Sequence, residues 1–207
     1  MNIILIGIQG SGKGTQAQLL SKKSGWEHIN VGDLFRRNIE QKTELGIKAK
    51  TFIDKGELVP DKYVFDVVEE AILKAKNGFI LDGFPRNIEQ LKFLTENIHV
   101  DKVILLVLDD KIAIKRISAR RNCERCKKVY NIIYNRPHLY GYCDECGSPL
   151  IQRDDDNEIA VAKRIEKFHQ ETQKVIELFK KEGKLLVVDA NHEVEAIHKE
   201  IVSKLTA

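Results

Sequence analysis

The chain has 207 residues, 43% of them hydrophobic, which is enough to bury a core within one domain or one domain with insertions. Lysine and arginine number 34 against 31 acidic residues, and a net charge of +3 is too small to indicate a nucleic-acid or membrane surface by itself. The apolar run from Ile3 is broken at Gly7 and has no cationic leader, so we expect no signal peptide, no membrane span and a cytoplasmic protein.

Short apolar runs alternate with helical stretches along the chain. Strands are predicted at residues 3–6, 79–81, 103–108 and 185–188, with a weaker fifth at 27–30. Because these runs are apolar throughout, we expect a parallel sheet of about five strands with helices on both faces. The clearest helix ends at Gly183. Its apolar stripe is predicted from steps of three or four and comprises Ile159, Ala162, Ile165, Phe168, Val175, Ile176 and Phe179.

Two segments fit this alternation poorly. Residues 32–60 are helical without a strand, and residues 122–156 are rich in cysteine, tyrosine, glycine and proline. We predict that both are insertions into the sheet domain. The division is then a core of residues 1–30, 60–121 and 157–207, one insertion at 31–59 and another at 122–156.

A glycine-rich loop follows the first strand and leads into a helix. Glycines let backbone N–H groups approach phosphate oxygens, the helix N-terminus adds partial positive charge, and Lys13 adds a full one. The strict pattern has serine or threonine directly after the lysine, whereas here Gly14 intervenes and the hydroxyl arrives at Thr15. The predicted phosphate-binding residues are Gly10, Ser11, Gly12, Lys13, Gly14 and Thr15.

Four cysteines lie in the second insertion as two Cys-x-x-Cys pairs, Cys123 with Cys126 and Cys143 with Cys146, separated by 16 residues. This spacing is a strong signal for a tetrahedral metal. Reduced thiolates suit Zn²⁺ best, with iron or disulfides as alternatives. Four protein ligands leave no open position, so we expect a structural metal that supplies the folding free energy a small flap cannot obtain from a core. His138, in the same insertion, is expected to be a surface or packing residue.

The glycine-rich loop resembles that of nucleoside monophosphate kinases, and two further stretches resemble adenylate kinase in particular. They read Gly32-Asp33-Leu34-Phe35-Arg36 and Asp82-Gly83-Phe84-Pro85-Arg86, the latter with Gln90 four residues on. The resemblance runs from Met1 to about Val194. It implies a P-loop NTPase fold, an AMP-binding insertion at 31–59, a zinc-binding lid at 122–156 and a monomer. The implied reaction is reversible, Mg²⁺-dependent phosphoryl transfer from ATP, or another nucleoside triphosphate, to AMP, giving ADP.

The same resemblance assigns roles to side chains. Around the transferring phosphoryl group it places Lys13, Arg86, Arg120, Arg153 and Arg164. On the donor side it adds Arg116, Arg120 and His192 to the loop residues. On the AMP side it places Val31, Arg36, Ile53, Gly83, Arg86, Gln90, Arg153 and Arg164. Asp33 and Asp82 would hold the waters of Mg²⁺; Asp82 also ends a buried strand at the sheet edge where open α/β folds bind ligands.

Two local features leave alternatives open. The run Asp154-Asp155-Asp156 resembles the hinge after the lid, but a solvated acidic turn fits it as well. Val31 stands where adenylate kinases usually have threonine: either it simply packs, since valine matches threonine in shape, or a hydroxyl that contacted adenine is missing, at a cost of about 0.5–1.5 kcal/mol. Gln90 is expected to keep AMP the best acceptor despite that loss.

Three other functions compete with this interpretation. A kinase for CMP, UMP or GMP would share the loop and the arginines and differ only in the acceptor pocket. A signalling P-loop protein would carry a guanine-reading Asn-Lys-x-Asp, which the sequence lacks. A zinc-ribbon nucleic-acid module would cluster basic residues on the ribbon, where acidic residues are interspersed instead.

Overall fold

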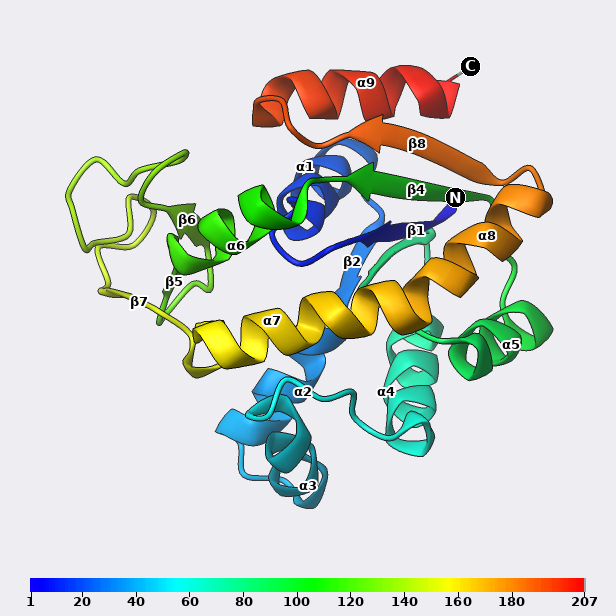
Figure 1. Ribbon diagram of the computed structural model, residues 1–207, viewed down its shortest axis with the longest axis horizontal. Helices are drawn as coiled ribbons and strands as arrows, with labels where there is room; N and C mark the ends of the chain where they lie inside the picture. Colours follow the sequence, from blue (N-terminus) through cyan, green and yellow to red (C-terminus); the bar gives the residue numbers. More distant parts are fainter. Residues whose placement is uncertain (207) are drawn as a thin grey trace.

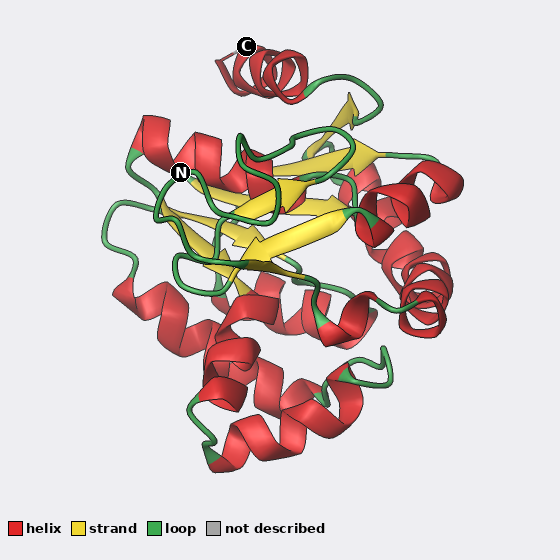
Figure 2. Ribbon diagram, turned by 90° about the vertical axis from the view of Figure 1, so that its left-hand side faces the viewer, coloured by secondary structure: helices red, strands yellow, loops and turns green. Residues whose placement is uncertain are grey.

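The computed structural model describes residues 1–206 and is built around a parallel sheet with helices on both faces (Figures 1 and 2). Its strands are β1 (Asn2–Gly7), β2 (Glu27–Asn30), β3 (Phe79–Asp82), β4 (Lys102–Val107) and β8 (Leu185–Asp189). They lie in the order β2-β3-β1-β4-β8, and every neighbouring pair is parallel. The predicted α/β fold and its five strands, including the weaker one at 27–30, are confirmed.

The central strand, β1, sets the position of the site. Ile4 pairs with Leu81 of β3 on one side and with Val103 of β4 on the other. The chain fills the β3 and β2 side first and only then crosses to β4 and β8. The carboxyl end of β1 is therefore next to the topological switch point, where open parallel sheets leave a crevice for ligands.

Side chains of β1 alternate between two hydrophobic clusters. Ile4 and Ile6 join the cluster under α2, α4, α5 and α8, whereas Ile3 and Leu5 join the one under α1, α6 and α9. The edge strand β8 is covered less completely, since Val187 is 47% exposed. The helices are α1 (Lys13–Ser24), α2 (Val31–Glu40), α3 (Glu44–Ile53), α4 (Asp61–Lys74), α5 (Ile88–Asn97), α6 (Asp110–Ser118), α7 (Glu158–Lys167), α8 (Gln173–Lys181) and α9 (Val194–Thr206). Within residues 1–206, no helix is long and apolar enough to cross a membrane.

Helices α7 and α8 form one continuous rod, joined by a π-helical turn at Phe168–Thr172 (Figure 1). The rod ends before Gly183, which takes a φ of 68° as predicted. The predicted start of the apolar stripe was wrong, because Ile159 is 82% exposed and Ala162 is exposed, while Val161 is buried. Two successive steps of three place Ile159 about 120° away from Ile165 on a helix of 3.6 residues per turn.

Two segments project from the sheet, at the bottom and the left of Figure 1. The first holds α2 and α3, which cross so closely that a Cβ on Gly46 would lie 2.1 Å from the carbonyl oxygen of Asn38. The second holds β5 (Arg120–Cys123), β6 (Val129–Asn131) and β7 (Leu150–Ile151), an antiparallel sheet in the order β6-β5-β7. Its small core consists of Cys123, Tyr130 and Cys143.

Candidate functional site

The loop between β1 and α1 has the geometry of an anion cradle. Gly12 caps α1 with a left-handed φ of 90°, and a Cβ on Gly10 would lie 2.8 Å from the Ala113 carbonyl oxygen. The Lys13 ammonium folds back over this loop and donates hydrogen bonds to the carbonyl oxygens of Gly7 at 2.6 Å and Ile8 at 3.0 Å. The Ser11 hydroxyl is buried without a hydrogen-bond partner among the described residues. A free helix N-terminus, a lysine and an unused hydroxyl together suit a phosphate group.

Burial lowers the pKa of Lys13 from its ordinary 10.5 to about 8, although the charge of Asp82 opposes the change. Asp82 ends β3, is 3% exposed and accepts a hydrogen bond from Asn30 Nδ2 at 2.6 Å. Burial raises the pKa of this carboxyl, but the His28 ring, whose Nε2 lies 3.5 Å from Oδ2, and the Lys13 charge bring it below its ordinary value. Asp82 is therefore an ionised carboxylate beside the cradle, a hydrogen-bond acceptor of the kind that can hold the waters of a hydrated Mg²⁺.

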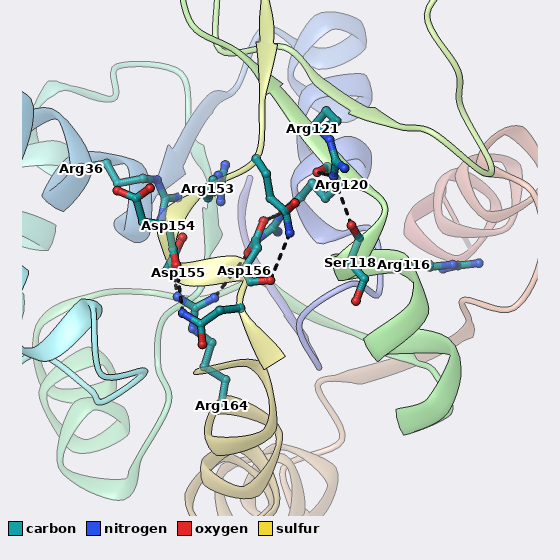
Figure 3. Close-up of polar contacts among 12 residues, drawn as sticks. Arg36, Arg116, Ser118, Arg120, Arg121, Arg153, Asp154, Asp155, Asp156 and Arg164 are labelled. Carbon is teal, nitrogen blue, oxygen red and sulfur yellow. Dashed lines mark hydrogen bonds and ion pairs between the residues drawn. The ribbon is translucent and has the colours of Figure 1, made fainter. Parts of the chain in front are cut away.

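The predicted arginines, which come from separate elements, meet beside this loop. In Figure 3, Arg36, Arg120, Arg153 and Arg164 gather around the acidic run at 154–156, while Arg116 points away. Arg120 Nε donates to Asp156 Oδ2 at 2.9 Å, and its Nη2 bonds the other oxygen of the same carboxylate. Arg164 bonds Asp155 and lies 3.7 Å from Asp156 Oδ1.

Asp33 lies among these arginines. Its Oδ1 accepts from Arg36 Nε at 2.9 Å and Nη2 at 2.6 Å, and lies 3.8 Å from Arg153 Nη2. The structure thus brings Asp82, one of the two carboxylates predicted to hold Mg²⁺ waters, next to Lys13. The contacts of the other, Asp33, are to guanidinium groups.

Burial and neighbouring like charges destabilise the charged form of two guanidinium groups in this cluster. Burial, followed by the like charge of Arg164, lowers the pKa of Arg86 to about 10. Burial, followed by the like charges of Arg36 and Arg120, lowers the pKa of Arg153 to about 9. Both groups stay charged at neutral pH. Cations crowded in this way are stabilised by any polyanion that enters between them, because opposite charge offsets both burial and repulsion.

The predicted donor-base residues lie on the other side of the loop. Arg116 Nη1 donates to the Ala190 carbonyl at 2.9 Å, and its guanidinium lies 5.4 Å above the ring of Tyr134. His192 is exposed, with Nε2 at 3.5 Å from Asp189 Oδ2. Arg116 thus presents a flat, partly buried cationic face, the shape on which a base can stack.

The predicted acceptor residues lie at the opposite end, around α2 and the loop after β3. Val31 is 4% exposed and packs in the hydrophobic cluster, with Ile53 half-buried against that cluster. Gln90 is 2% exposed, on the first turn of α5. Arg86 Nε donates to the Gly83 carbonyl at 2.7 Å, which fixes the guanidinium next to the backbone of that glycine.

The four cysteines come together in the second projection. All four are free thiols, and their sulfur atoms lie within 4.8 Å of one another. Cys123 and Cys146 are 3.4 Å apart and Cys126 and Cys143 3.5 Å apart, near the separation of about 3.8 Å that four Zn–S bonds of tetrahedral geometry require. Hydrogen bonds from Ser148 lower the pKa of Cys146 to about 6. The donor set fits a tetrahedral metal with an affinity for thiolates.

Sequence reasoning left the acidic run undecided, and the structure separates its members. Asp154 is exposed, as a solvated turn requires, but Asp155 is 7% and Asp156 3% exposed, and both pair with arginines. The cation–π contact of Arg116 with Tyr134 was also not foreseen. His138 is exposed, as expected.

A parallel sheet with a phosphate loop at its switch point, facing a cluster of arginines, defines a P-loop phosphotransferase. A sequence model of the adenylate kinase family matches residues 5–184. Among curated relatives named adenylate kinase, that of Acetivibrio thermocellus is 45% identical, covering 100% of this chain and 98% of the relative. Those of Chloroherpeton thalassium and Archaeoglobus fulgidus are 44% and 43% identical, with 96% or more of each chain covered. The chain belongs to the adenylate kinase family, which confirms the resemblance.

Proposed function

We propose that this protein catalyses the reversible transfer of a phosphoryl group from ATP to AMP, forming two molecules of ADP. The observation that carries the proposal is the convergence of Lys13 and the arginines on the space beside the phosphate loop, with Asp82 at its edge. Such a cluster suits phosphoryl transfer, in which the protein forms no covalent bond to the substrate. Catalysis then depends on positioning the two substrates and on placing cations near the negative charge that develops in the transition state.

Each part of the cluster would act on a different phosphate. The loop at residues 10–15 would hold the donor phosphates, with Lys13 facing the transferred group. Arg36 and Arg86 would grip the AMP phosphate, whose oxygen attacks. Arg120, Arg153 and Arg164 would surround the group in transit, and Asp155 and Asp156 keep two of these guanidinium groups oriented. Arg116 would stack on the donor base, with His192 nearby.

Mg²⁺ would be held through water by Asp82, with Asp33 as a second candidate, and would neutralise phosphate charge when bound. The buried, ionised state of Asp82 supports this assignment. A second metal, Zn²⁺ in preference to iron, would be held by the four cysteines and would be structural.

The two projections would close over the substrates and exclude water. Residues 31–59 would cover AMP and residues 122–156 the triphosphate, with the rest of the chain as the core. Two contacts between the projections support closure: Lys127 Nζ lies 2.7 Å from Glu40 Oε1, and Arg153 approaches Asp33. Expulsion of water would keep the phosphoryl group from being hydrolysed. A cytoplasmic monomer without a nucleic-acid or membrane partner completes the proposal.

A related kinase for CMP, UMP or GMP is the alternative, because it would share every cation named above. The test is a panel of ATP and GTP against AMP, GMP, CMP and UMP with Mg²⁺, read by chromatography of the products. Reactions without acceptor, and with excess chelator, are the controls for hydrolysis and for metal dependence. We expect ADP from ATP and AMP in the highest yield; faster transfer to another monophosphate would replace the proposal by the alternative.

A further inference from the structure

The side-chain amide of Gln90 is held at both ends. Its Oε1 accepts a hydrogen bond from the backbone N–H of Arg86 at 2.8 Å, and its Nε2 donates to Asp61 Oδ1 at 2.7 Å. Gln90 is 2% exposed, so water does not offer substitutes for these partners. The position of this amide is therefore set by the protein.

Asp61 reaches Gln90 from a different element, since it is the first residue of α4. Its two oxygens also accept hydrogen bonds from Asn87 Nδ2 at 3.2 and 3.1 Å, and Asn87 Oδ1 caps α5 by accepting from the Gln90 backbone N–H at 2.8 Å. Asp61 thus joins the start of α4 to the start of α5 and fixes the amide between them.

An ionised carboxylate can only accept hydrogen bonds, whereas a backbone N–H can only donate. The NH₂ group of Gln90 must therefore face Asp61, and its carbonyl must face Arg86. Rotating the amide by 180° would set two acceptors against each other at Asp61 and two donors against each other at Arg86. Both partners hold the amide in one of its two orientations.

In this orientation each end of the amide keeps one hydrogen-bonding group without a partner among the described residues 1–206: one N–H on Nε2 and one lone pair on Oε1. Adenine offers the matching edge, an acceptor at N1 and a donor at its 6-amino group. Guanine offers the reverse, a donor at N1 and an acceptor at O6, and would match only the rotated amide.

We propose that Asp61 is a positioning residue that acts through Gln90 to make the acceptor site select adenine over guanine. This proposal rests on the proposed function, with Gln90 at the AMP base as the resemblance to adenylate kinases implies. A wrong base would leave buried donors and acceptors unpaired, and sites of that kind discriminate strongly.

The test is Asp61→Asn, which keeps the shape of the side chain but can donate as well as accept. The control is Asp66→Asn, the same change at an exposed position of the same helix. We expect Asp61→Asn to lower the ratio of kcat/KM for AMP to kcat/KM for GMP about tenfold, the scale of one bidentate amide–base contact, with the control unchanged. Because both rates come from one preparation, any unfolded fraction cancels from the ratio.

A cycle with Gln90→Ala separates positioning from a general structural effect. If Asp61 acts through the amide, Asp61→Asn leaves the ratio unchanged in the Gln90→Ala background. Two results would overturn the role of Asp61 without touching the proposed AMP kinase activity. One is an AMP-to-GMP ratio of kcat/KM in Asp61→Asn within about twofold of wild type. The other is an equal fall of that ratio on adding Asp61→Asn to wild type and to Gln90→Ala. A wild-type protein that prefers another acceptor overturns the proposed function, and this inference with it.

Discussion

Replacing Lys13 by methionine should stabilise the free protein while nearly abolishing phosphoryl transfer. The phosphate loop shields the Lys13 ammonium from most of the solvent, and the ammonium faces the like charges of Arg86 and Arg120, with Asp82 as the opposing charge. In the absence of nucleotide this cation is therefore an electrostatic cost to the folded protein. On the proposed function, the same cation would face the developing charge of the transferred group once nucleotide is bound.

The size of the effect follows from the pKa of Lys13. Its fall from 10.5 to about 8 means that burying the charged form costs about 3.4 kcal/mol at most. Some solvent reaches the side chain and screens part of this cost. Methionine also leaves the carbonyl oxygens of Gly7 and Ile8 without their donor, a loss of about 1–2 kcal/mol. We expect a net gain in the free energy of unfolding of about 1 kcal/mol at pH 7.

The gain should depend on pH in a defined direction. Between pH 8 and pH 10.5 Lys13 has lost its proton in the folded protein but keeps it in the unfolded chain, so the unfolded state binds more protons and wild-type stability rises with pH. The advantage of Lys13→Met should shrink across that range. Urea unfolding at several pH values measures it, with the exposed Lys23→Met at the end of the same helix as control. A variant less stable than wild type at pH 7, a gap independent of pH, or more than about a tenth of wild-type kcat would refute the reasoning.

Two further predictions concern the cysteine cluster and the acceptor pocket. If the cysteines hold the proposed metal, stripping it should lower the melting temperature and speed hydrogen exchange in residues 122–156 while the sheet stays folded and still binds AMP, because the four cysteines all lie in that segment. Protein purified without bound metal, and with all four thiols titratable, would contradict this prediction. Val31→Thr should lower the KM for AMP a few-fold at nearly constant kcat by restoring one neutral hydrogen bond, and Gln90→Ala should be more damaging. An unchanged KM in Val31→Thr would show that residue 31 only packs.

The sequence was sufficient where the signal is local. The strand at 3–6 is predicted by continuous apolar residues, and the cradle by glycines within a few residues of Lys13. The phase of α7 was misjudged at Ile159, since steps of three and four are both helical and only the sum of the steps defines a face. Burial of residues at the end of a helix depends on which other elements pack against that end. The periodicity of the helix sequence carries no information about those elements.

The buried carboxylates lie outside the reach of local patterns for a different reason. Asp155 and Asp156 look solvated in sequence because their counter-charges, Arg164 and Arg120, come from α7 and β5. Asp61 likewise bonds Gln90 across 29 positions of the chain. A buried charge is tolerated only when paired, so exposure of an acidic residue cannot be judged until its partner is placed.

These ion pairs separate the arginines of the substrate-free protein into two groups: those already bonded to a carboxylate and those that are not. Arg120 and Arg164 already hold carboxylates, so their direction is fixed and an entering phosphate must share them with Asp156 and Asp155. The guanidinium of Arg86 bonds the carbonyl of Gly83 and forms no ion pair within residues 1–206, and burial with the charge of Arg164 lowers its pKa. A phosphate that reaches Arg86 replaces repulsion by attraction without breaking an ion pair. On the proposed function, we therefore expect most of the electrostatic gain on phosphate binding at Arg86 and Arg153, the two guanidinium groups whose pKa is lowered most, while Arg120 and Arg164 would contribute their fixed orientation to the transferred group.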